Sequence, residues 1–320
     1  MATFAINLIP DGTLSDVVAL AVAAESAGVD CIRLYDEGLI THDVHVVASA
    51  IATRTATVRI GPGITNPYTR HPAQTASALA SLHDLSDGRA VAGYGAGGSL
   101  TLDAMGLQRH RPLAAIADLI NVSRGLWSGN TVSYAGETVS LRDAHLPGGR
   151  RTIPIWVAGR GPNVLALGAR EADGVILDFL HEQTLHTSVD TVRHAAQHRS
   201  TPVLLSYSTS IVMNEADFAA VRPHMTYRLV DSPPAVQHAL GMTARNIADI
   251  REAMADGLQA AATLLRDEWI YPFILHGDAD QCRLQLKKLI DRHNFDEFML
   301  PIFEMDEPHE YVNRVGELFS

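Results

Sequence analysis

Cysteine and long apolar runs are scarce in this sequence. Only Cys31 and Cys282 are cysteines among 320 residues, too few for a disulfide framework or a cysteine-based metal site. No apolar run approaches the roughly 20 residues that span a bilayer. The N-terminus has neither the basic segment nor the apolar core of a secretion signal. These absences argue against a disulfide-stabilised scaffold and a membrane protein, and they predict a cytoplasmic location.

Positive charge is also in deficit. Lysine and arginine number 25 against 36 aspartates and glutamates, which gives a net charge of −11 and predicts that neither nucleic acid nor an anionic membrane is a partner. The 15 histidines are scattered without a metal-ligand spacing, so no metal is predicted. No Gly-x-Ser-x-Gly motif is present, so a serine hydrolase has no support.

What the sequence does contain is a regular alternation of strands and helices. Strands are predicted at residues 3–8, 31–35, 58–64, 89–93, 153–158, 174–179, 202–212 and 298–302. Amphipathic helices are predicted between them, as at residues 16–27, 44–54 and 72–85. Eight such units predict a (β/α)8 TIM barrel, and an open doubly wound sheet is the alternative.

Two segments do not fit a minimal barrel. Residues 128–151 are predicted to form an excursion after helix 4, with a hairpin around Gly136. Before strand 8, residues from about 218 to 270 have helical patterns and predict an inserted helical subdomain, which either covers the active-site face or serves dimer packing. The sequence therefore predicts one barrel domain over residues 1–320 with one helical insertion.

Candidate functional residues cluster where the predicted strands end. Strand 3 ends in Gly61, Pro62 and Gly63, and glycine within a strand indicates a bulge or a close approach of the backbone to another group. A kink without side chains suits a flat cofactor ring, and a glycine- and proline-rich surface turn is the alternative. Because strand ends of a barrel meet at one face, their clustering favours a site there.

Two other strand ends carry charged groups. Asp36 and Glu37 follow strand 2, and the alternation of an extended chain directs only one of them into a pocket. Gly159, Arg160 and Gly161 follow strand 5 at the start of a predicted helix. Backbone N–H groups and a guanidinium there form either a phosphate cradle or a tight turn.

Weaker signals lie beside these groups. Residues 93–98 (GYGAGG) superficially match a dinucleotide-binding fingerprint, but their glycine spacing is wrong and they follow strand 4 rather than strand 1. His42, His45 and His71 are candidate acid–base or substrate-binding residues, and a structural or surface role is the alternative for each.

Five stretches of the chain resemble the bacterial luciferase-like superfamily of flavin- and deazaflavin-dependent oxidoreductases. Within it, the closest resemblance is to the methylenetetrahydromethanopterin reductase-like branch. The stretches are residues 61–72 (GPGITNPYTRHP), 82–97 (LHDLSDGRAVAGYGAG), 153–162 (IPIWVAGRGP), 172–176 (ADGVI) and 273–282 (FILHGDADQC). The resemblance covers most of the chain, weakens over about 218–270, and depends on the combination and order of the motifs.

The resemblance implies a (β/α)8 barrel, often dimeric, that binds coenzyme F-420 or FMN at its C-terminal mouth and acts on a small molecule. It also implies a non-prolyl cis peptide in the bulge of strand 3, here between Gly63 and Ile64. The cofactor contacts that it implies by motif position are Asp36, Gly63, Ile64, Thr65, Asn66, Gly95, Gly97, Gly159, Arg160 and Gly161.

The chain departs from this pattern at two positions. Many deazaflavin-dependent members have Asp-His after strand 2, where this chain has Asp36 and Glu37. The sugar-phosphate dehydrogenases have an acidic residue where this chain has Gly98, which disfavours a sugar-phosphate substrate. Glu37 is therefore the candidate proton donor, and Asp36 and His42 complete the candidate catalytic residues.

Three functions remain open at this level. The first is an F-420-dependent oxidoreductase that transfers a hydride to or from a small organic substrate, with the cofactor carrying the chemistry. The second is an FMN-dependent monooxygenase that uses oxygen, and the third is a non-catalytic flavoprotein with the same fold. Residues 66–71 (NPYTRH) favour the first.

Overall fold

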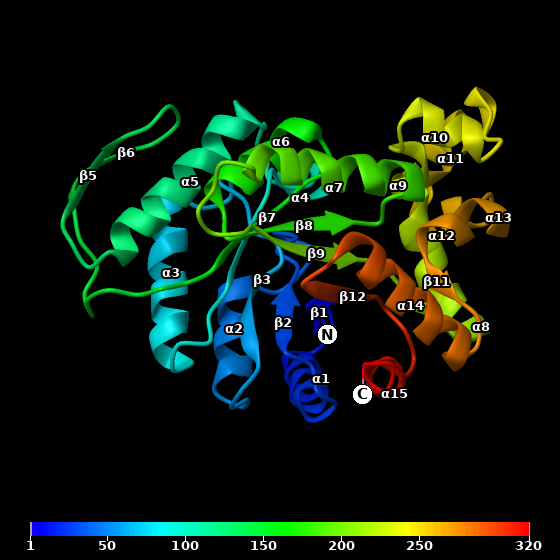
Figure 1. The fold of residues 1–320 in the computed structure, drawn as a ribbon, viewed down its shortest axis with the longest axis horizontal. Helices are drawn as coiled ribbons and strands as arrows, with labels where there is room; N and C mark the ends of the chain where they lie inside the picture. Colours follow the sequence, from blue (N-terminus) through cyan, green and yellow to red (C-terminus); the bar gives the residue numbers. More distant parts are fainter. Residues whose placement is uncertain (1, 320) are drawn as a thin grey trace.

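Eight parallel strands form the centre of the protein. The structure is a computed structural model that describes residues 2–319. Around the sheet the strands are β3 (Arg59–Pro62), β2 (Cys31–Leu34), β1 (Thr3–Leu8), β12 (Glu297–Ile302), β9 (Leu204–Ser208), β8 (Gly174–Asp178), β7 (Ile155–Ala158) and β4 (Ala92–Tyr94) (Figure 1). Isolated parallel bridges, Ile60 with Ala90 and Thr65 with Tyr94, join the two end strands. The predicted (β/α)8 barrel is confirmed, and the open doubly wound alternative is wrong.

Helices surround the barrel, and their first residues explain where several of them begin. Thr13, Asp43 and His71 accept hydrogen bonds from backbone N–H groups of the helices that follow them. Pro72 and Pro162 occupy first helical positions, where the missing N–H costs nothing. These outer helices are α1 (Leu14–Ser26), α2 (Val44–Ala52), α3 (Pro72–Leu85), α4 (Ser99–Ala104), α5 (Pro112–Trp127), α6 (Pro162–Glu171), α7 (Glu182–Ala196), α14 (Ala279–His293) and α15 (Pro308–Gly316).

Strands 3 and 4 are shorter than predicted, and their backbones approach each other closely at two glycines. A Cβ at Gly61 would lie 1.8 Å from the Val91 carbonyl oxygen. A Cβ at Gly93 would lie 2.4 Å from the Pro62 carbonyl oxygen. The glycines therefore do mark a close approach of the backbone, as predicted. At Gly61 and Gly93 the group that approaches is the neighbouring strand.

The predicted seventh strand divides into two. β9 stays in the barrel, whereas β10 (Ile211–Val212) leaves it and pairs in parallel with β11 (Leu275–His276). Between β10 and β11 lie the inserted helices α8 (Glu215–Val221), η1 (Arg222–His224), α9 (Met225–Val230), α10 (Pro234–Ala239), α11 (Ala244–Ala253), η2 (Met254–Asp256), α12 (Leu258–Ala262), α13 (Asp267–Ile270) and η3 (Tyr271–Phe273). The insertion (at the right in Figure 1) is thus a few residues longer at each end than predicted.

The excursion after the fourth barrel helix is also present. β5 (Val132–Ala135) and β6 (Ser140–Ala144) form an antiparallel hairpin whose turn contains Gly136. The buried carboxylate of Asp118 on α5 accepts hydrogen bonds from the Tyr134 hydroxyl and the Thr138 backbone. These bonds attach the hairpin to the barrel wall. Among residues 2–319, no helix combines the length and the apolar character needed to cross a bilayer.

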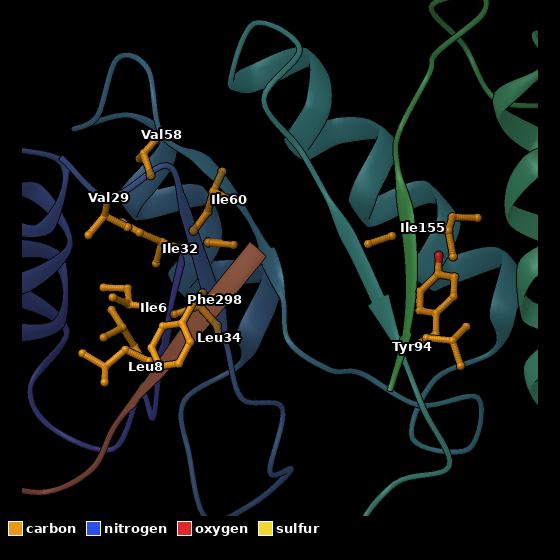
Figure 2. Close-up of a cluster of buried hydrophobic side chains, with 14 of the residues drawn as sticks. Ile6, Leu8, Val29, Ile32, Leu34, Val58, Ile60, Tyr94, Ile155 and Phe298 are labelled. Carbon is orange, nitrogen blue, oxygen red and sulfur yellow. The ribbon is translucent and has the colours of Figure 1, made fainter. Parts of the chain in front are cut away.

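Alternate residues of the strands face the helices and the barrel interior. Ile6, Leu34, Ile60 and Phe298 belong to the large apolar cluster between strands and helices (Figure 2). A smaller cluster lines the interior: Ala5, Cys31, Val91, Trp156, Ile176 and Met299. The interior also holds a buried ion pair, in which Arg33 Nη2 lies 3.0 Å from Glu297 Oε1. The barrel is therefore a packed core, open to chemistry only at its ends.

Candidate functional site at the mouth of the barrel

The bulge of strand 3 forms one wall of the C-terminal mouth. The peptide between Gly63 and Ile64 is cis, as the resemblance implied. Asn7 at the end of β1 donates a hydrogen bond of 2.5 Å from its Nδ2 to the Gly63 carbonyl oxygen. A Cβ at Gly63 would lie 2.4 Å from the Arg33 Cβ. The bulge can pack onto β2 only with glycine at this position.

Asp36 holds the loop that follows the bulge. Its carboxylate accepts a 2.6 Å hydrogen bond from the Thr65 hydroxyl and lies 3.2 Å from Arg70 Nη1, and the same guanidinium pairs with Asp43 through its Nη2. Asn66 Oδ1 accepts hydrogen bonds from two backbone N–H groups of the same loop, at residues 68 and 69. Asp36, Thr65 and Asn66 are all buried, and together they fix the wall that the resemblance assigns to the cofactor ring.

Glu37 contacts a different element from its neighbour Asp36. It accepts a 2.6 Å hydrogen bond at Oε2 from the Thr101 hydroxyl on α4. A Cβ at Gly98 would lie 3.8 Å from the same carboxylate oxygen. The Glu37 carboxylate therefore lies beside the position at which the sugar-phosphate dehydrogenases are expected to have an acidic residue. Because Glu37 and Gly98 follow different strands, the sequence alone does not reveal that they are close.

The glycine turns after β4 and β7 differ in how tightly they are packed. A Cβ at Gly95 would lie 2.1 Å from Ile64 Cδ1, and one at Gly97, which has a φ of +74°, would lie 3.3 Å from the Asn66 side chain. Both residues are thus brought against the bulge. Gly159 packs against Val164, whereas Gly161 has open space where a Cβ would be. The predicted phosphate cradle is therefore open at Gly161.

Two of the three candidate histidines, His42 and His71, bond outside this arrangement. His42 is exposed, and its Nε2 is hydrogen-bonded to the Gly12 carbonyl oxygen at 2.9 Å. His71 Nδ1 accepts a hydrogen bond from the Ala73 N–H and caps α3. Burial lowers the pKa of His45 on α2, which lies near enough to Arg70 and Asp36 to interact with their charges. Neither of its buried ring nitrogens has a hydrogen-bond partner among the described residues. His71 thus has a structural role, as the cap of α3. A catalytic role for His42 stays a prediction.

The insertion supplies the opposite wall of the mouth through Arg228 on α9. Its guanidinium lies 3.8 Å from the centre of the Phe179 ring and 3.5 Å from Asp178 Oδ2, both at the end of β8. It also donates a 2.5 Å hydrogen bond to the Tyr227 hydroxyl. Asp178 lies 3.5 Å from Arg160 Nη2 as well. One carboxylate thus joins the inserted helices to the glycine turn after β7.

Comparison with known proteins places the chain in a family. Residues 3–293 match the family model described as luciferase-like monooxygenase. The chain belongs to this luciferase-like family. It is 28% identical over 297 residues to the 5,10-methylenetetrahydromethanopterin reductase of Archaeoglobus fulgidus, and that alignment covers 89% of each chain. The predicted resemblance to the luciferase-like superfamily and its methylenetetrahydromethanopterin reductase-like branch is confirmed.

Two solved structures share the luciferase-like barrel. The coenzyme F-420-dependent tetrahydromethanopterin reductase of Methanopyrus kandleri superposes with a TM-score of 0.89 at 24% identity, over 99% of this chain and 97% of that one. An F-420-dependent secondary alcohol dehydrogenase in complex with an F-420–acetone adduct superposes with a TM-score of 0.79 at 18% identity, over 100% of this chain and 99% of that one. These structures establish that the whole chain, including the inserted helices, follows a known architecture.

Sequence reasoning missed several residues of this luciferase-like mouth. Asn7 is the last residue but one of β1 and Asp178 is the last of β8, so the strand-end signal that identified Asp36 also applied to them. Tyr227 and Arg228 lie in a short helix with no motif of its own, and nothing local marks them. Burial, followed by the Asp178 carboxylate, raises the pKa of the Tyr35 phenol well above its usual value. This phenol therefore keeps its proton and can donate a hydrogen bond in the mouth.

His224 provides a pH-dependent test of how firmly the insertion is attached. Its ring stacks on Phe303 at 3.8 Å, and burial together with the Arg228 guanidinium lowers its pKa from 6.5 to about 4. Between pH 6.5 and 4, the His224 side chain is therefore protonated in the unfolded chain and neutral in the folded chain. The contribution of neutral His224 to the free energy of unfolding is therefore fully present above pH 6.5, and roughly 3 kcal/mol of it is lost as the pH drops to 4.

Replacing His224 by phenylalanine is expected to remove this part of the acid sensitivity while keeping the ring stack. Urea unfolding at several pH values between 4 and 7 measures it. If the wild-type protein and the variant lose stability equally across this range, His224 does not carry the effect.

Proposed function

We propose that this protein is a coenzyme F-420-dependent oxidoreductase that transfers a hydride to or from a small organic substrate. The relatives described above are reductases and a dehydrogenase, two of them named as F-420-dependent, which supports the cofactor and the reaction class. In this proposal residues 1–320 act as one barrel domain in a cytoplasmic homodimer. Its partner in the reaction is a small molecule bound beneath the inserted helices.

The observation that carries the proposal is that two buried polar atoms near the C-terminal ends of the strands, among several in the described residues, lack a hydrogen-bond partner. Asn7 Oδ1 near the end of β1 and Ser208 Oγ at the end of β9 are buried and have no hydrogen-bond partner among the described residues. Buried polar atoms of this kind are rare unless a ligand or water satisfies them. An acceptor and a hydroxyl at the base of the mouth suit the polar edge of a flavin-like ring.

The remaining residues fit the rest of such a cofactor. Asp36, Thr65 and Asn66 hold the rigid wall against which the ring would lie. The N-terminus of α6, with Arg160 and the open face at Gly161, would hold the phosphate of the tail. When bound, the cofactor would donate or accept the hydride, and the protein would supply orientation, exclusion of water and, in the reductive direction, a proton.

Glu37 is the proposed source of that proton. Its carboxylate is half-buried, oriented by the Thr101 hydroxyl and adjacent to Gly98. A positioned carboxylic acid can protonate a substrate atom as the hydride arrives, and it can remove a proton in the reverse direction. On the far side of the mouth, Phe179 and Phe303 are both buried beneath Arg228 and keep that side dry.

The test is a fluorescence titration of purified, cofactor-free protein with F-420 and, separately, with FMN. We expect micromolar or tighter binding of F-420 and much weaker binding of FMN. Arg160→Met is expected to weaken F-420 binding about tenfold or more, because a charge-assisted hydrogen bond contributes about 1.5–3 kcal/mol.

The matched control is Arg170→Met, which removes the same charge from the last turn of α6 and is expected to leave binding unchanged. Binding of FMN alone would move the assignment to an oxygen-using monooxygenase, the activity that the family model describes. Binding of neither cofactor would refute both assignments and leave a barrel without this chemistry.

A further inference from the structure

A second cavity lies outside the barrel mouth, in the ring of helices. It has a volume of about 570 Å³ and is bounded by α7, α14 and the chain segment 272–275 that ends the insertion. This volume lies within the range of small-molecule sites. None of its lining residues is among those placed at the mouth. The Arg292 guanidinium on α14 pairs with Glu182 on α7, so the cavity lies beside a direct link between the two helices.

The floor of the cavity is apolar, and two of its polar atoms already have hydrogen-bond partners within the protein. Leu180, Leu185, Tyr207, Phe273 and Ile274 line it and are each less than a tenth exposed. The Tyr207 hydroxyl donates a hydrogen bond to the Leu180 carbonyl oxygen, and the carbonyl oxygen of Phe273 accepts one from Thr209. Because these polar atoms already have partners, the floor offers a ligand apolar and aromatic surface only.

The rim, in contrast, carries positive charge. Gln285, Lys288 and Arg292 lie three and four residues apart on α14, which places them on one face of the helix above the cavity. The charge of Arg292 is balanced by Glu182. Among residues 2–319, Lys288 has no ion-pair partner within 4.0 Å, although its neighbour Lys287 pairs with Asp291. The rim therefore has one uncompensated cation directly over an apolar floor.

We propose that this cavity is a second small-molecule site, for an amphipathic anion. The apolar body of the ligand lies on Leu185, Tyr207 and Phe273, and its carboxylate or sulfonate lies at Lys288. The complementarity of charge at the rim and of apolar surface at the floor identifies this class of ligand. The site is separate from the mouth, so it does not depend on which cofactor the barrel binds.

The test uses the full-length protein and 8-anilinonaphthalene-1-sulfonate, a fluorescent probe with an aromatic body and a sulfonate. We expect saturable binding of one probe per chain, displaced by octanoate. Lys288→Glu is expected to weaken binding about tenfold or more, in keeping with the loss of a charge-assisted contact. Lys287→Glu, a charge reversal at the adjacent residue outside the cavity, is the matched control and is expected to have no effect.

A second variant, Leu289→Trp, fills the cavity from α14 and is expected to abolish binding. If it fails to fold, Lys288→Glu still decides the question, because an exposed charge reversal leaves the core intact. Equal probe binding by the wild type and Lys288→Glu would overturn the proposal, and so would the absence of saturable binding. Neither result bears on F-420 binding, which is measured separately.

Discussion

Replacing Glu37 by glutamine is expected to lower turnover by about 10²- to 10⁴-fold, the contribution typical of a positioned acid or base. The change keeps the size of the side chain, and an amide oxygen can still accept the hydrogen bond from Thr101. F-420 affinity is expected to stay unchanged, because Asp36 rather than Glu37 holds the bulge loop. The measurement is steady-state turnover with a substrate identified by an anaerobic screen, alongside the fluorescence titration.

The neighbouring residues provide the controls for this experiment. Thr101→Val removes the hydrogen bond that orients Glu37 and is expected to lower turnover by less than Glu37→Gln does. Asp36→Asn is expected to weaken F-420 binding, because it loosens the attachment of Thr65 and Arg70. Unchanged turnover in Glu37→Gln would show that the proton comes from another group. An equal loss of cofactor affinity would make Glu37 a binding residue.

The second large effect concerns stability and the ion pair inside the barrel. Glu297→Gln is expected to destabilise the protein by about 3–5 kcal/mol, because it leaves the charge of Arg33 buried without its counter-charge. Both side chains are almost completely buried. Arg33 Nε and Nη1 have no other hydrogen-bond partner among the described residues, and the guanidinium lies 4.8 Å from the Trp156 ring. Urea unfolding monitored by circular dichroism measures the change.

Two further variants separate burial of charge from loss of an ion pair. The double variant Arg33→Met/Glu297→Met removes both charges and is expected to be far closer to wild type than Glu297→Gln, because neither charge is then left unpaired. Asp291→Asn breaks the exposed pair with Lys287 and is expected to cost about 0.5 kcal/mol or less. A loss below about 1 kcal/mol in Glu297→Gln would mean that water reaches Arg33 inside the barrel.

The architecture was largely predictable from the sequence because its signals are local. Alternating strand and helix patterns identified all eight barrel strands, and the start of α3 at Pro72 followed from one proline. Glycines correctly marked the bulge, but the contact of Gly61 with the Val91 carbonyl oxygen depends on a neighbouring strand. The split of strand 7 into β9 and β10 was missed, because it depends on pairing with β11, more than 60 residues later.

The sequence predicted only one of the two walls of the candidate site. Asp36, Thr65 and Asn66 follow strand ends, and the structure joins them through hydrogen bonds within one wall. Arg228 belongs to the opposite wall, and its position depends on how six-residue helix α9 packs onto β8. Short helices without a motif give no indication of which side chain will meet a distant strand. The wall that contains Arg228 could therefore not be predicted before the structure.

Because β10 pairs with β11, the first and last residues of the inserted helical segment lie next to each other. Ile211 is opposite Leu275, and Val212 is opposite His276, so the two ends of the insertion leave the barrel side by side. A segment whose ends already meet can be lengthened, shortened or exchanged without moving the strands that carry it. The inserted helices can thus change in sequence and length while the bulge of strand 3 stays the same, and a chimaera that receives another relative's helices between Val212 and Leu275 would keep the same barrel.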